Sequence, residues 1–256
     1  MDNVKNKTAI VTGGGSGIGY AITEDLLHKG AKKVAIIDLP LERCYNATVT
    51  LQEKFGKDRV VFFPTDITNA ESYKETFKDI VNVFNGLDIL INNAGICKDN
   101  NPEQTFAINV VALIRGSMLG LDYMGKHKNG KGGTIVNISS LSGLGPFFLM
   151  PVYCSSKHAV IGFSSCLEKF YDKTGVRILT MCPSFTTTLM TSVAQLNESF
   201  DILDENLFNN WNHQSATHVG QATVTAIQKG ENGSYWIVKN NEPPSPIKLV
   251  KHTEWL

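Results

Sequence analysis

The sequence feature that most restricts the fold is a glycine-rich turn close to the first residue. Residues 12–19 read Thr-Gly-Gly-Gly-Ser-Gly-Ile-Gly, between an apolar run at 8–11 and a helical pattern at 18–29. Glycines in such a turn let the backbone approach a pyrophosphate closely, and the N-terminus of the helix offers free N–H groups. The sequence therefore predicts a dinucleotide-binding strand–turn–helix unit, whose cofactor contacts are Gly13, Ser16, Gly17, Ile18 and Gly19.

Apolar runs and amphipathic stretches alternate along the rest of the chain. We predict further strands at 34–37, 60–63, 89–91, 134–138, 177–181 and 235–238, and helices at 42–55, 71–84, 104–127 and 152–173. These strands are continuous apolar runs, which is typical of a parallel sheet buried on both faces. The sequence thus predicts an α/β fold, a Rossmann-type doubly wound parallel sheet with helices on both faces. We interpret residues 1–256 as a single domain, with a substrate loop at about 184–215 and an apolar C-terminal tail at about 240–256.

The charge and cysteine content exclude several classes of partner. Lys and Arg number 24, as do Asp and Glu, so the formal net charge is zero. Without a basic surplus we expect neither nucleic acid nor an anionic membrane as partner. The five cysteines are odd in number and form no Cys-x-x-Cys pair, which indicates reduced thiols. We expect a cytoplasmic protein with neither a signal peptide nor a membrane-spanning segment.

Asp38 ends the second predicted strand, where the adenosine ribose of a bound dinucleotide would lie. Its carboxylate can accept hydrogen bonds from both ribose hydroxyls and would repel a 2′-phosphate. Ser16, inside the turn, offers such a phosphate no positive charge, although Arg43 lies near in sequence. The predicted cofactor is therefore NAD, with an ordinary strand-end cap as the alternative interpretation of Asp38.

Tyr153 and Lys157 are the candidate catalytic pair. They stand four residues apart in a predicted helix and hence on one of its faces. A free tyrosine ionises near pH 10, and a neighbouring ammonium group favours the phenolate, which could then accept the proton of an alcohol. Ser140 follows the strand at 134–138, where its hydroxyl could hold the substrate oxygen.

With these residues, the chain from about Lys7 to Trp236 resembles the short-chain dehydrogenase/reductase family. The matching motifs are the glycine turn, Asp66-Ile67, Asn92-Asn93-Ala94-Gly95, Asn109, Ser140 and Tyr153-x-x-x-Lys157. The resemblance implies that Tyr153 is the base, that Lys157 lowers its pKa and binds the nicotinamide ribose, and that Ser140 orients the substrate oxygen. It further implies a water relay supported by Asn109, an adenine site flanked by Asp66 and Ile67, and a cofactor path lined by Asn93, Ala94 and Gly95. Within the family the chain is most similar to insect-type alcohol dehydrogenases and 15-hydroxyprostaglandin-dehydrogenase-like members.

One departure from the family pattern follows the strand at 177–181. The family usually has Pro-Gly at this place, whereas this chain has Pro183-Ser184. A serine adds a Cβ atom where backbone and cofactor come close, so we expect a shifted loop or local angles that suit serine. By resemblance this loop holds the nicotinamide carboxamide, with Pro183, Phe185, Thr186 and Thr188 as contacts.

The expected reaction moves a hydride between an uncharged or amphiphilic alcohol, secondary in type, and NAD, and gives the carbonyl compound. By resemblance to the family, residues 189–211 cover this alcohol or ketone substrate. Their apolar side chains favour a lid that partly packs, with a plain amphipathic helix pair packed on the sheet as the alternative. Zinc chemistry is the first alternative, but the six histidines and five cysteines are dispersed, so we expect no metal. A catalytically silent NAD-binding scaffold that acts through protein partners is the second. Broad apolar faces of the helices at 104–127 and 152–173 predict a homodimer, with a homotetramer as the alternative.

Overall fold

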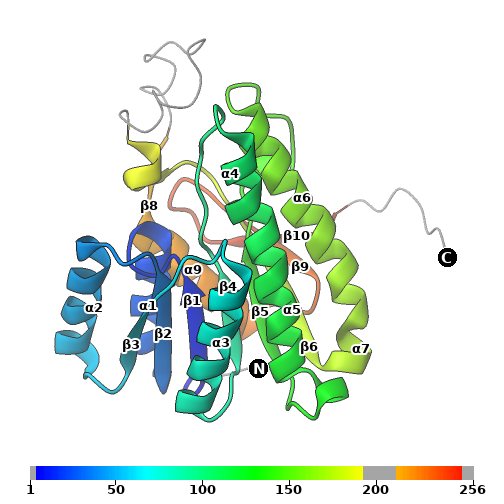
Figure 1. The fold of residues 1–256 in the computed structure, drawn as a ribbon. Coiled ribbons are helices and arrows are strands. Elements are labelled where there is room, and N and C mark those ends of the chain that lie inside the picture. Colours follow the sequence, from blue (N-terminus) through cyan, green and yellow to red (C-terminus); the bar gives the residue numbers. More distant parts are fainter. Residues whose placement is uncertain (1–3, 193–211, 250–256) are drawn as a thin grey trace.

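The computed structural model describes residues 4–192 and 212–249, and within these the chain builds an eight-stranded sheet (Figure 1). The strand order is β10-β9-β6-β5-β4-β1-β2-β3. All neighbours run parallel except β10, which pairs antiparallel with β9. The strands are β1 Thr8–Thr12, β2 Lys33–Asp38, β3 Val60–Pro64, β4 Ile89–Asn92, β5 Gly133–Ile138, β6 Val176–Pro183, β9 Ser234–Val238 and β10 Ser245–Ile247.

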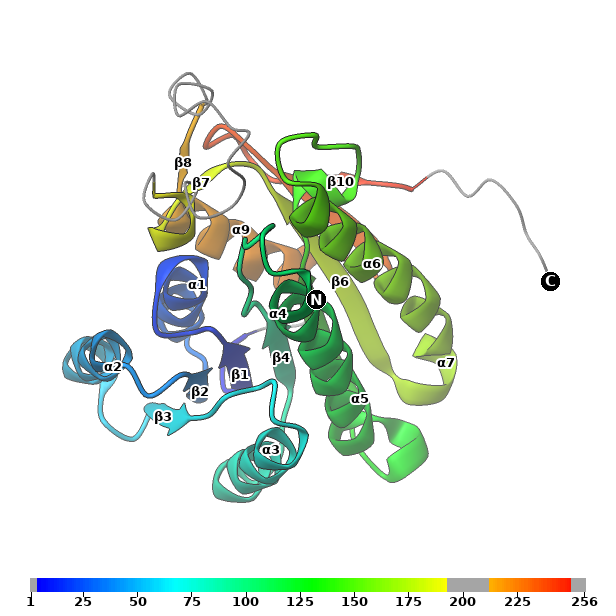
Figure 2. The same cartoon turned by 45° about the horizontal axis from the view of Figure 1, so that its top comes forward.

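Helices cover both faces of this sheet (Figure 2). The helices α1 Gly17–His28, α2 Glu42–Phe55 and α9 Ala216–Lys229 pack on one face, and α3 Ala70–Phe84, α5 Leu113–Met124 and α6 Pro151–Leu167 pack on the other. Short α4 Pro102–Phe106 and α7 Tyr171–Thr174, and a two-stranded pair of β7 Thr186–Thr187 with β8 Gln214–Ser215, complete the α-helices and strands of the described residues. The predicted doubly wound α/β class is confirmed.

Alternating side chains of β2 explain why its sequence is continuously apolar. Val34 and Ile36 belong to the core beneath α1, α2 and α9, whereas Ala35 and Ile37 belong to the core beneath α3, α5 and α6. All four are fully buried. Burying a side chain of this size contributes about 1.5–3 kcal/mol, so both faces of the strand stabilise the fold.

The helix predicted at 104–127 is interrupted. A π-helical segment, Ala107–Ala112, separates α4 from α5, and Gly125 ends α5 with an extended backbone. The continuous helical stretch Pro102–Met124, which includes α4, the π-helical segment and α5, has the length and apolar composition of a membrane-crossing helix. No membrane-spanning segment was expected from the sequence. Half of the stretch's most apolar window is buried inside the protein, and Leu121 and Met124 pack on the sheet, as in the core helix of a folded domain.

The sequence did not predict helix α9, edge strand β10 or the short strands β7 and β8. In β10, Pro246 pairs with Trp236. A proline lacks the N–H that a central strand needs but fits an edge strand. Residues 193–211 of the predicted lid and residues 250–256 of the predicted tail lie outside the described residues.

The strand order reverses at β1, because β2 follows on one side and β4 lies on the other. In open α/β sheets such a reversal leaves a crevice outside the carboxyl ends of the strands. The glycine turn follows β1 and residues 93–95 follow β4, so the topology brings the two predicted cofactor motifs to this crevice.

Gly116 in α5 tests the packing beneath this crevice. A Cβ atom there would lie 2.5 Å from Tyr73 Oη and 2.6 Å from Asn92 Oδ1, both buried. We expect Gly116→Ala to lower the free energy of unfolding by about 1–3 kcal/mol, because a well-packed core cannot admit the methyl group. Thermal unfolding measures this, with Gly162→Ala in α6 as the matched control. No atom lies within 4 Å of a Cβ at Gly162, so the control should stabilise or leave Tm unchanged. Equal Tm shifts in the two variants would contradict this packing.

Candidate functional site

A cavity of about 1080 Å³ opens at the carboxyl edge of the sheet. It extends from the glycine turn past Asp38 and Asp66 to Tyr153. Most of the predicted site residues line it: Gly13, Ser16, Gly17, Ile18, Asp38, Asp66, Ile67, Asn93, Ala94, Gly95, Ser140, Tyr153, Lys157, Pro183, Phe185, Thr186 and Thr188. Gly19 and Asn109 lie behind its wall, where they support neighbouring groups.

The glycine turn packs directly against the segment after β4. Gly13 has a φ of +65°, and a Cβ atom there would lie 2.9 Å from Ala94 Cα. Asn93 Nδ2 donates to the carbonyl oxygens of Thr12 and Gly13 at 2.9 and 3.2 Å. At Gly19 a Cβ atom would overlap the carbonyl oxygen of Gly13. Gly19 therefore permits close packing of helix and turn, although it does not line the cavity.

Asp38 is held in place by backbone amides. Its Oδ2 accepts from Gly15 N at 2.9 Å, and its Oδ1 accepts from Leu39 N at 2.8 Å. The Cys44 thiol also hydrogen-bonds this carboxylate, whose two oxygens together have about four acceptor sites, so acceptor capacity remains for a ligand hydroxyl. Arg43 also lines the cavity, so a cation does lie in this region, as its place in the sequence suggested. The carboxylate still lies between the glycine turn and the cavity, as the NAD prediction requires.

The Asp66–Ile67 segment follows β3 and is fixed from two sides. Asp66 Oδ1 accepts from the backbone N and Oγ1 of Thr68 at 2.9 and 2.7 Å. Arg115 of α5 donates to the carbonyl oxygen of Ile67 at 3.3 Å. These contacts set the shape of the cavity wall at the end where the adenosine is predicted to bind.

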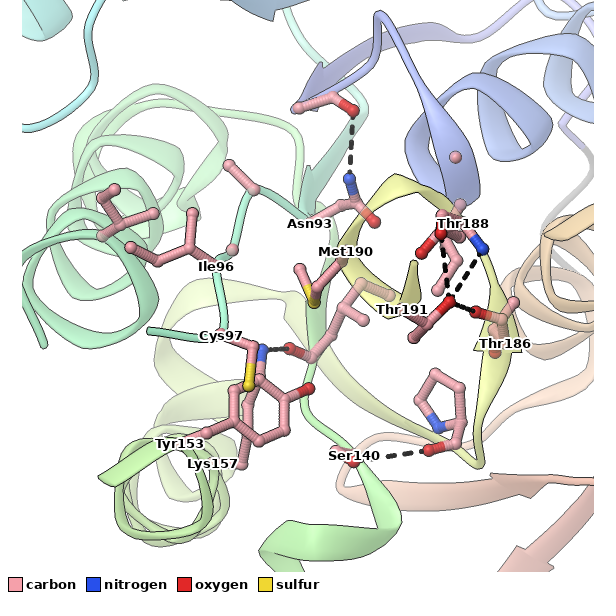
Figure 3. A pocket seen from close by; sticks show the side chains of 18 of the residues that line it. Asn93, Ile96, Cys97, Ser140, Tyr153, Lys157, Thr186, Thr188, Met190 and Thr191 are labelled. Atoms are coloured by element: carbon pink, nitrogen blue, oxygen red, sulfur yellow. Dashed lines mark hydrogen bonds between the residues drawn. The ribbon is translucent and has the colours of Figure 1, made fainter. Parts of the chain in front are cut away.

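Tyr153, Lys157 and Ser140 converge at the other end of the cavity (Figure 3). Tyr153 and Lys157 lie on the same face of α6, with Lys157 Nζ 5.6 Å from the centre of the phenol ring. Lys157 Nζ donates to the carbonyl oxygen of Ile138 at 2.9 Å. Ser140 follows β5, and its hydroxyl accepts from Ser142 N at 3.1 Å. Figure 3 places the threonines Thr186, Thr188 and Thr191 across the cavity from this group, with Met190 between.

Burial controls the ionisation of these groups. It raises the pKa of Tyr153 well above its usual range, Cys97 raises it further, and the Ser140 hydroxyl lowers it. Burial lowers the pKa of Lys157 to about 8. Burial also raises the pKa of the Cys97 thiol to about 12, so this cavity-lining cysteine is a neutral thiol at neutral pH. Without further positive charge in the cavity, Tyr153 is a neutral phenol.

Asn109 lies in the π-helical segment and is fully buried. Its Oδ1 accepts from Ile96 N and its Nδ2 donates to Ile96 O, both at 2.9 Å. Nδ2 also donates to Ser156 Oγ at 3.0 Å. Asn109 thus joins the loop after β4 to helix α6. A π-helical turn at this position is common near functional sites, and the sequence carried no signal for it.

Ser184 occupies the usual glycine position without strain, because its φ is not positive. Its backbone N donates to Val238 O at 2.8 Å, and Thr186 Oγ1 donates to its carbonyl oxygen at 2.8 Å. Of the two alternatives, local angles that suit serine are therefore found. Thr188 Cγ2 would lie 3.1 Å from a Cβ at Gly17, so this loop reaches the glycine turn across the cavity.

Sequence reasoning missed part of the cavity wall. Phe147 and Met150, from the loop before α6, form an apolar cluster with Cys97, Phe185 and Met190. Cys97 Sγ lies 3.1 Å from Met150 Sδ. Nothing in the local pattern of residues 144–150 marks a ligand wall, except that the loop joins two predicted catalytic motifs and is rich in apolar residues.

Comparisons with known proteins agree with this geometry. Residues 7–199 match the family described as short chain dehydrogenase. The chain is 45% identical over 188 residues to 15-hydroxyprostaglandin dehydrogenase [NAD(+)] of Rattus norvegicus, covering 73% of this chain and 70% of that protein. It is 34% identical over 239 residues to alcohol dehydrogenase 1 of Ceratitis capitata, covering 92% of each chain. The crystal structure of levodione reductase superposes with a TM-score of 0.80 at 21% identity, over 92% of this chain and 97% of that one. The predicted resemblance is confirmed: the chain belongs to the short-chain dehydrogenase family.

Proposed function

We propose that the protein is an NAD-dependent oxidoreductase that converts an uncharged or amphiphilic secondary alcohol into its ketone. The observation that carries this proposal is the convergence of Ser140, Tyr153 and Lys157 on one cavity with the glycine turn and Asp38. The cavity provides a cofactor site and proton-transferring groups together, which the reaction requires. The name of the rat relative, which includes NAD(+), supports the choice of cofactor.

The residues present fit a dinucleotide. Gly13 and Gly17 have positive φ and leave the turn without side chains where phosphates would approach, beside the N-terminus of α1. Asp38 would bind the adenosine ribose, and Asp66 and Ile67 would flank the adenine. Thr186, Thr188, Pro183 and Phe185 would hold the carboxamide. When bound, the oxidised nicotinamide supplies the hydride acceptor and a positive charge.

Each polar group at the inner end has a defined role in this proposal. Ser140 binds the substrate oxygen and stabilises its developing charge. Tyr153 accepts the alcohol proton at its Oη. Lys157 favours the phenolate by its charge and binds the nicotinamide ribose. Asn109 would support the water relay to Lys157 that the family resemblance implies, and its bonds to Ile96 hold its side chain in place.

The chemistry of the wall supports the substrate class. Cys97, Phe147, Met150, Phe185 and Met190 carry no charge, and Tyr153 packs against the same apolar cluster. A charged substituent beside the reacting carbon would lose its hydration without gaining a partner. This wall therefore favours apolar groups on both sides of the hydroxyl carbon.

The scaffold alternative has no observation in its favour. A silent cofactor binder would need the glycine turn and Asp38 but would not need Ser140, Tyr153 and Lys157 to face one another. For the assembly we retain the homodimer, because Val111 and Met118 of the 102–124 helix are each about half exposed, 48% and 51%. A cytoplasmic location fits the cysteines, none of which forms a disulfide among the described residues.

Tyr153→Phe tests the base. The variant keeps the ring and its packing but cannot take the proton, so we expect kcat to fall about 1000-fold while the Kd for NAD changes little. NADH formation by the purified protein with NAD and a panel of short, terpenoid, lipid and steroid alcohols measures kcat. Tyr171→Phe, at a tyrosine 39% exposed on α7, is the matched control. A Tyr153→Phe variant within tenfold of the wild type would overturn the assignment.

Asp38 should set the choice between NAD and NADP. A 2′-phosphate beside its carboxylate is a like-charge contact that costs several kcal/mol, so we expect kcat/KM to favour NAD on the order of 100-fold. Asp38→Ser should reduce this ratio at least tenfold. Asp58→Ser removes an equal charge at an exposed site and should leave the ratio unchanged. Equal kinetics with both cofactors in the wild type would reject the assignment.

The reaction should need no metal ion. Among residues 4–192 and 212–249, no group of three or more His, Cys, Asp or Glu side chains is arranged to hold one. We therefore expect unchanged kcat after dialysis against a chelator, with metal content followed by mass spectrometry. A loss of activity that zinc restores would refute this expectation.

A further inference from the structure

Helix α6, which carries Tyr153 and Lys157, begins without a cap of its own. Met150 is the N-cap residue and its side chain accepts no hydrogen bond from the helix. Pro151, the first helical residue, has no N–H. The amides of Val152 and Tyr153 are thus the first free donors, and buried helix ends require partners for such groups.

The carboxylate of Asp99, 53 residues before Val152 in the chain, accepts hydrogen bonds from both of these amides. Its Oδ2 accepts from Val152 N at 2.8 Å, and its Oδ1 accepts from Tyr153 N at 3.0 Å. The side chain is only 4% exposed. Burial raises the pKa of Asp99 and the two amides lower it, so the helix end offsets part of the cost of burying this carboxyl.

The segment that carries Asp99 is itself firmly held. Asn109 binds both backbone polar atoms of Ile96, and Thr105 Oγ1 donates to Lys98 O at 2.8 Å. Cys97, between them, contacts Met150 next to the start of α6. The two carboxylate oxygens therefore hold two successive amides of the helix at a fixed position relative to this loop.

We propose that Asp99 is a positioning residue for the reaction, which fixes the height and rotation of the first turn of α6 so that the Tyr153 hydroxyl faces Ser140. This inference rests on the proposed role of Tyr153. One hydrogen bond would leave the turn free to rotate, whereas two parallel bonds to adjacent amides fix it. Reaction rates depend steeply on such placement, since a shift of about 1 Å can cost on the order of 100-fold.

The test compares Asp99→Asn and Asp99→Ala. The asparagine variant has the same shape and keeps one acceptor, but its NH2 group would face the second amide. We expect kcat to fall about tenfold in Asp99→Asn and on the order of 100-fold in Asp99→Ala, with the Kd for NAD, measured by calorimetry, within about twofold of the wild type. Partial rescue by asparagine separates hydrogen bonding from simple loss of the side chain.

Arg59 offers the matched control. Its guanidinium donates to the carbonyl oxygens of Leu27, in the last turn of α1, and Ala31, just after that helix, at 2.9 and 2.7 Å. Arg59 precedes β3, the strand at the opposite edge of the sheet. Arg59→Ala removes two charge-assisted bonds to backbone without touching the cavity. It should lower Tm, as Asp99→Ala does, and leave kcat unchanged.

Asp99→Asn within twofold of the wild-type kcat would overturn the inference. The inference would also be overturned if Arg59→Ala lowered Tm as much as Asp99→Ala and lowered kcat by the same factor. Tyr153→Phe in the same series separates the two levels of the argument. If that variant stays active, the proposed function fails. If it is inactive while Asp99→Asn is fully active, only the positioning role fails.

Discussion

The close approach of the chain after β1 to the chain after β4 is the constraint on which the rest of the site depends. Thr12 Oγ1 accepts from the amides of Asn93 and Ala94 at 3.0 and 3.1 Å, and the Asn93 side chain returns to the turn. Gly13 must lack a side chain for this contact to form. The strand order places the carboxyl ends of β1 and β4 side by side, so the pairing of these strands in the sheet determines the conformation of the turn. The floor of the cavity is therefore part of the core.

Beneath the inner end of the cavity, buried polar side chains join the elements that carry the proposed catalytic groups. Asn92 of β4 donates to Ser117 of α5 and Asn137 of β5 at 2.9 Å, and Asn137 donates to Ser164 of α6 at 2.9 Å. Buried amides that lose a partner are costly, so this chain of bonds resists sliding of α6 along the sheet. Asp99 contacts the first turn of the same helix, at Val152 and Tyr153, and the network contacts its last turn, at Ser164. Lys157 lies between these two points.

Sequence reasoning succeeded where the local pattern and the tertiary environment agree. The strand cores and the glycine turn were predicted correctly, because continuous apolar runs indicate burial on both faces and glycines indicate positions of positive φ. It failed for α9, whose β-branched residues and Gly220 are poor helix formers. That helix forms because Gly220 lets it pack against Ala21 of α1, a contact 199 positions apart in the chain. Asp99 and the Phe147–Met150 wall were missed for the same reason, since their partners are near only in the folded protein.

The electrostatics of the inner cavity imply an order of events. Burial alone disfavours the phenolate of Tyr153 and the ammonium of Lys157, since it raises the first pKa and lowers the second to about 8. At neutral pH the lysine is nonetheless mostly charged and the tyrosine mostly neutral. A phenolate becomes favourable only when the cavity holds more positive charge than Lys157 supplies. The neutral thiol of Cys97 and the apolar wall around it strengthen this dependence, because they exclude the water that would otherwise screen the charges. As the proposed base, Tyr153 would gain basicity only with an oxidised, positively charged cofactor beside it, which would couple proton removal to the presence of the hydride acceptor.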